Sequence, residues 1–247
     1  MSKTKKEMMV LNIASGLFLL TMFALVLTFW NNPVIYPIKL FTVLLHELSH
    51  GLAAVVSGGS IIEIEISKEI GGHCITSGGY QPLIASAGYL GSMLLGGLIM
   101  LSASIEKASK AISMAIAVAM AVLTAIYIRN TFGVVFTLSF ATFLFVSGRF
   151  LPEFINSIVL RFLGIVSSLY AVIDIKEDLI DRTVAISDAS AMSELFFFPP
   201  KFWGIFWIII AVISTFYFFK WSLSIEMEKK QRKASQNQSE ILPPSNF

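Results

Sequence analysis

Apolar runs long enough to cross a bilayer recur along this chain, and they limit its fold more than any other feature. A transmembrane helix needs about 20 consecutive apolar residues to cover a hydrocarbon core of about 30 Å. Only 14% of the 247 residues are charged, against about a quarter in soluble domains. We therefore predict an all-α, polytopic protein of about six to seven transmembrane helices, integral to the cell membrane. The expected spans are approximately Met8–Trp30, Pro37–Val56, Pro82–Ser102, Ala111–Ile128, Thr131–Val146, Glu153–Ile175 and Phe202–Phe219.

The segment between the second and third runs has the pattern of a β-hairpin. Isoleucine and glutamate alternate over Ile62–Ile66, which is the period-two pattern of a strand. Gly71-Gly72 is predicted to form the turn, and His73–Ser77 the returning strand. We expect this small insert at about residues 60–79, directly after the second span.

The two ends of the chain are rich in basic residues. Lysines at positions 3, 5 and 6 favour a cytoplasmic N-terminus. Basic ends of a membrane protein usually face the cytoplasm and anionic lipid, so they indicate the bilayer as partner and not nucleic acid. Residues 224–247 are polar and are predicted to form a disordered tail.

The second span contains the motif His46-Glu47-Leu48-Ser49-His50, which holds two of the three histidines of the chain. Residues i and i+4 lie on one face of a helix, so both imidazoles can point at one metal ion. This is the spacing of zinc metalloproteases, in which the glutamate is the general base. The alternative is a buried polar cluster that joins helices through hydrogen bonds. We predict His46 and His50 as zinc ligands and Glu47 as the catalytic residue.

A catalytic zinc site usually has three protein ligands, and the four aspartates of the chain all lie between positions 174 and 188. With a cytoplasmic N-terminus, the second and sixth spans both run toward the cytoplasm. Asp174 at the end of the sixth span then lies at a depth similar to that of His50. Asp174 is therefore the first choice for the third ligand and Asp178, one helical turn later, the second. The alternative for both is a solvated charge at the end of a span.

Two further patterns indicate structural roles. Ser187-Asp188-Ala189 is typical of a helix N-cap, and it precedes a helix predicted over residues 190–197. Gly88, Ser92 and Gly96 recur every four residues in the third span. Small residues at this spacing allow helices to pack closely in a membrane, and we expect the catalytic helix as their partner.

In these residues the chain resembles the site-two protease family of intramembrane metalloproteases, and more closely its compact prokaryotic peptidase-B-like branch. The resemblance covers roughly residues 40–189. The matching segments, in order, are His46–Gly51, Gly58-Gly59 with the hairpin, Ala87–Ser92, Arg129–Gly133, Asp174–Leu179 and Ser187–Ala189. The resemblance implies that His46 and His50 hold zinc, that Glu47 is the general base, and that an aspartate of a later span is the third ligand.

The function expected from the motif and the resemblance is zinc-dependent endopeptidase activity. The substrate would be a membrane protein or a membrane-proximal peptide, hydrolysed by metal-activated water. Residues 1–223 would form the transmembrane metalloprotease domain. The alternative is a non-proteolytic membrane scaffold or regulator that retains the metalloprotease fold.

Overall fold

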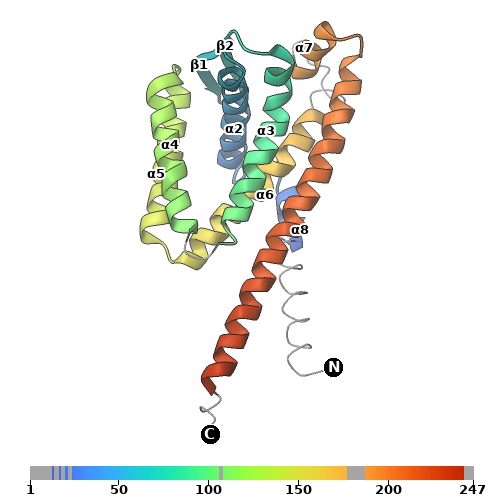
Figure 1. Cartoon of the computed structure of the whole chain (residues 1–247). Coiled ribbons are helices and arrows are strands. Elements are labelled where there is room, and N and C mark those ends of the chain that lie inside the picture. Colours follow the sequence, from blue (N-terminus) through green and yellow to red (C-terminus); the bar gives the residue numbers. More distant parts are fainter. Residues whose placement is uncertain are drawn as a thin grey trace.

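The computed structural model describes residues 13, 17, 20, 21, 24–105, 108–176 and 187–241. It is a bundle of long helices with a two-stranded sheet at one end (Figure 1). In chain order the elements are α2 (Tyr36–Val56), β1 (Ser60–Ser67), β2 (Gly71–Ser77), α3 (Gln81–Ser102), α4 (Ser109–Tyr127), α5 (Thr131–Phe150), α6 (Glu153–Lys176), α7 (Asp188–Leu195) and α8 (Pro200–Ile241).

Six of the described helices are long and apolar enough to cross a membrane: α2, α3, α4, α5, α6 and the first part of α8, Pro200–Lys229. They correspond to the second to seventh expected spans. About half of the first expected span, Met8–Trp30, lies outside the described residues. The protein is therefore a multi-pass integral membrane protein, as its apolar runs predict.

The helix that contains the histidines lies inside the bundle. Two-thirds of the most apolar windows of α2 and α6 are buried within the protein, against 17% for α8. Glycines allow α3 to pack closely against α6. A Cβ atom added to Gly96 would lie 2.7 Å from Cβ of Ser167, and one added to Gly164 would lie 2.5 Å from the amide nitrogen of Met100. Gly96 therefore has the packing role that its spacing predicts, but its partner is α6 and not the helix that contains the histidines.

The hairpin packs over the end of α2, near the turn between α4 and α5 (Figure 1). Ile64 and Ile66 are completely buried, which explains the alternation in β1. The expected hairpin is confirmed, but the turn is not at Gly71-Gly72. It lies over residues 68–70, where Ile70 has a φ of +62°, and both glycines belong to β2.

Asn130, in the short turn between α4 and α5, closes the outer edge of β1. Its side-chain amide donates to the carbonyl of Ile66 at 2.7 Å and accepts from the amide of the same residue at 3.3 Å. Ile128 also forms an isolated parallel bridge with Ile64. The second edge of β1 is thus occupied, so the unpaired edge of the described sheet belongs to β2.

The C-terminal segment differs from the expectation of a disordered tail. Helix α8 is 42 residues long and continues through residues 224–241. Glutamate, lysine and glutamine are frequent in this segment, and their straight side chains favour helix even where the sequence is polar.

Candidate metal centre

Helix α2 places both histidines of the motif on one buried face. His50 and Glu47 are less than a tenth exposed, and the centroids of the two imidazole rings are 4.8 Å apart. An i, i+4 pair on a helix gives this arrangement without any contribution from the loops. The geometry predicted for the two histidines is therefore present in the fold.

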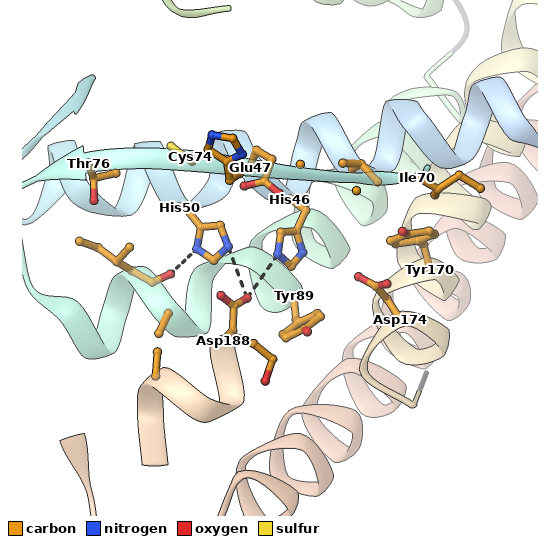
Figure 2. Close-up of a pocket in the computed structure, with 18 of the residues that line it drawn as sticks. His46, Glu47, His50, Ile70, Cys74, Thr76, Tyr89, Tyr170, Asp174 and Asp188 are labelled. Atoms are coloured by element: carbon orange, nitrogen blue, oxygen red, sulfur yellow. Dashed lines mark hydrogen bonds and ion pairs between the residues drawn. The ribbon is translucent and has the colours of Figure 1, made fainter. Parts of the chain in front are cut away.

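The third group at this position is Asp188, the first residue of α7. Its Oδ2 atom lies 3.3 Å from Nε2 of His46 and 3.3 Å from Nε2 of His50. Figure 2 shows the carboxylate beneath the two rings. One ligand atom from each of these three residues lies within 4.8 Å of the other two. Two imidazoles and one carboxylate form a donor set typical of catalytic zinc.

The hydrogen bonds around His50 are compatible with a cation between these groups. Nδ1 of His50 lies 2.7 Å from the carbonyl oxygen of Ile84. A carbonyl can only accept, so Nδ1 carries a proton, and in the neutral ring that metal binding requires, Nε2 presents a lone pair toward Asp188. Within the described chain, Oδ2 of Asp188 is buried and has no well-aligned hydrogen bond. A metal ion would satisfy these facing lone pairs, so the residues present fit a metal.

Helix α3 forms the wall of the site behind the imidazoles. A Cβ atom at Gly88 would overlap Nε2 of both His46 and His50. The next residue, Tyr89, packs its ring edge-on against His46, with centroids 4.8 Å apart. Only glycine therefore leaves the space next to the two nitrogens open, and Gly88 contacts α2 as its spacing predicts.

Strand β2 covers Glu47. A Cβ atom at Gly72 would lie 2.9 Å from Cγ and 3.0 Å from Oε1 of Glu47. The absence of a side chain at Gly72 lets the strand backbone pass directly over the carboxylate. This close approach explains a glycine within a strand, where it would otherwise weaken the structure.

A family model described as Peptidase M50B-like matches residues 19–218. The chain belongs to this family. No curated protein and no solved structure matches it. The matched range includes the six described spans up to Phe218, the hairpin and all three groups of the centre. Membership confirms the resemblance to the site-two proteases and identifies a peptidase family of membrane proteins.

In this member of the M50B-like family, the structure brings Asp188 to the histidines in place of the expected Asp174. Asp174 lines the same pocket, but in the view of Figure 2 it lies beyond His46. It does not belong to the group of three potential ligands. Asp178, the second choice, lies outside the described residues. The assignment of the third ligand therefore moves to Asp188, as a prediction.

The sequence pattern around Asp188 suggests a helix cap and does not indicate that this residue lies next to the two histidines. Ser187 is the N-cap of α7: its hydroxyl accepts from the amide of Ser190, whose own hydroxyl accepts from the amide of Ser187. The expected cap is present, and the serine provides it. Asp188 is therefore free to point at α2. A second capping-type residue next to a serine that already caps the helix is the signal that could have identified it.

The pocket around the centre has a volume of about 450 Å³. Cys74 and Thr76 of β2 line one wall (Figure 2). Burial, and then the neighbouring Glu47 carboxylate, raise the pKa of the Cys74 thiol to about 12. Cys74 is not one of the three residues whose potential ligand atoms converge at the centre. His73 instead lies 3.7 Å from Glu65 across the hairpin.

Proposed function

We propose that this protein is a zinc-dependent endopeptidase that cleaves a membrane protein, or a peptide close to the membrane. The observation that supports it most strongly is the convergence of His46, His50 and Asp188, with Glu47 buried next to His46. Membership of a peptidase family supports the same reaction class.

Each residue of the centre has a defined role in this proposal. His46, His50 and Asp188 would hold zinc and leave a coordination position for water or substrate. When bound, zinc supplies a Lewis acid that polarises the scissile carbonyl and lowers the pKa of water. Glu47 takes the proton from the attacking water and passes it to the leaving amine. Burial of Glu47 under β2 keeps its carboxylate at the site and away from bulk solvent.

The depth of the centre supports a substrate at or near the membrane surface. His50 and His46 are 6 and 10 residues before the end of α2 at Val56. This corresponds to about 9–15 Å along the helix axis. The hairpin and α7 lie at the same end of the bundle (Figure 1). A substrate segment can therefore reach the centre from one membrane surface without crossing the whole bilayer.

The unpaired edge of β2 is suited to hold the substrate backbone. A peptide bond in a transmembrane helix is already hydrogen-bonded, so the helix must unwind before cleavage. The unwound segment exposes amide and carbonyl groups, which an edge strand can pair. Because Asn130 closes the edge of β1, and Gly72, Cys74 and Thr76 of β2 line the pocket, the added strand would run beside Glu47.

A proline scan of a model single-span substrate tests this strand addition. Proline lacks the amide donor, and successive amides of a strand point in opposite directions. We expect cleavage to fall by about tenfold at every second position near the scissile bond, roughly the value of one lost hydrogen bond. Proline at positions distant from the scissile bond serves as the control. Uniform sensitivity, without a period of two, would contradict pairing with β2.

Metal analysis tests the proposed function itself. We expect about one equivalent of zinc per chain in protein purified without added metal, because three converging ligands form a complete catalytic site. Removal of zinc with a chelator should abolish cleavage of a reconstituted single-span substrate, and added zinc should restore it. Wild-type protein without stoichiometric metal would overturn the proposal. Retained zinc without cleavage of any membrane substrate would favour the non-proteolytic scaffold or regulator.

A further inference from the structure

Exposed aromatic residues follow directly after the helix that carries Asp188. This segment, Leu195–Phe198, begins at the last residue of α7 and continues into the connection to α8. Its three phenylalanines and its leucine are all exposed, and Phe197 is completely so, at 108% of the reference area. Four consecutive large apolar side chains with this much exposed area are a poor surface for water.

The segment is continuous with a surface that faces lipid. Helix α8 begins at Pro200 and crosses the membrane, and its residues Phe202, Ile205 and Phe206 are exposed. Phe198 stacks on Phe202, with ring centroids 4.4 Å apart. The aromatic surface of α8 therefore extends without a break into the segment before it, at the depth where the span starts.

We propose that Leu195–Phe198 is a membrane anchor that inserts into the bilayer interface and positions Asp188 at the metal centre. Aromatic side chains at the start of a span are stable at the depth of the lipid head groups. Lys201, exposed and next to the segment, provides a positive charge for lipid phosphate. The occupant of this surface is thus the bilayer in which α8 is embedded.

The short helix α7 connects the anchor to the centre. It has only eight residues, with Asp188 at its first position and Leu195 at its last. Ala189 and Met192 pack against Tyr89 and Trp207, so one face of α7 rests on α3 and α8. The bundle holds this face, and the anchor holds the C-terminal end. Loss of the anchor would loosen the placement of the carboxylate relative to His46 and His50.

Insertion is tested by labelling Phe197→Cys with an environment-sensitive fluorophore, in a Cys74→Ser background and in phospholipid nanodiscs. We expect blue-shifted emission, quenching by doxyl lipids and protection from aqueous iodide. Ile205→Cys on the lipid-facing surface of α8 is the membrane control, and Glu69→Cys at the hairpin turn is the water control. Iodide quenching equal to that of the Glu69 site would overturn the anchor. Protection from both quenchers, as under a bound protein, would overturn it as well.

Coupling to the centre is tested by the zinc affinity of Phe197→Asp in otherwise wild-type protein. We expect the zinc Kd to rise about fivefold or more, the lower end of typical coupling between sites. Phe154→Asp is the matched control, because Phe154 is 74% exposed and lies at the start of α6, the opposite end of the bundle. An unchanged Kd for Phe197→Asp, or an equal rise for Phe154→Asp, would overturn the coupling. This part rests on the proposed function, and absence of zinc in the wild type would refute that function while leaving the insertion result intact.

Discussion

Substitution of Glu47 by glutamine is expected to reduce cleavage by about 10²- to 10⁴-fold, the usual contribution of a general base, while zinc remains bound. Glutamine has the shape of glutamate, so it fits the buried space beneath Gly72. Its amide cannot accept the proton of the attacking water. His46, His50 and Asp188 are unchanged and should retain the metal. The measurement is the cleavage rate of a reconstituted single-span substrate together with the zinc content of the same preparation.

Glu63→Gln is the matched control for this experiment. Glu63 is a partly buried carboxylate on β1, and it does not line the pocket of the centre. Its substitution removes the same charge from the neighbouring hairpin and should leave cleavage within about twofold, as for most substitutions away from a site. Cleavage by Glu47→Gln at a rate close to wild type would exclude Glu47 as the base. Loss of zinc from this variant would instead indicate that Glu47 supports the metal site.

The spans are predictable from sequence because the bilayer core requires the same simple pattern at every crossing. Each crossing needs an apolar run of fixed length, so the runs alone locate α2 to α6 and the start of α8. The polar segments are less constrained. Gly71-Gly72 has the sequence of a turn, but β2 uses Gly72 for its approach to Glu47. Residues 224–241 have the composition of a tail, yet they continue an existing helix, which requires no new nucleation.

The residues of the metal centre also differ in how far they can be predicted from sequence: the two histidines are close together in the chain, and the aspartate is distant. His46 and His50 are one helical turn apart, so helix geometry alone brings them together. Asp188 is 138 positions beyond His50 in the sequence, and no periodicity connects them. Comparison of depths correctly places Asp174 in the same pocket, but it cannot show which aspartate points inward. This depends on how Ala189 and Met192 seat α7 against the bundle.

Substitution of each of the two candidate aspartates by asparagine should affect zinc binding to very different extents. Asp188→Asn should weaken zinc binding by more than about 100-fold, because loss of a group that only supports a ligand already costs about 10- to 100-fold. Asparagine keeps the size of the side chain but removes the charge that faces the two Nε2 atoms. Asp174→Asn should change zinc binding only a few fold, through the loss of a charge in the same pocket. Competition with a chromophoric chelator measures both affinities.

Glu194→Gln controls for the loss of a negative charge from α7, because Glu194 is exposed on the same short helix. It should leave the zinc affinity unchanged, since a surface charge is screened by solvent and salt. Equal thermal unfolding of the three variants in their metal-free forms would show that the fold is intact. Normal zinc affinity in Asp188→Asn, with loss in Asp174→Asn, would return the third ligand to the end of α6. It would also require α7 to occupy a different position in the metal-bound protein.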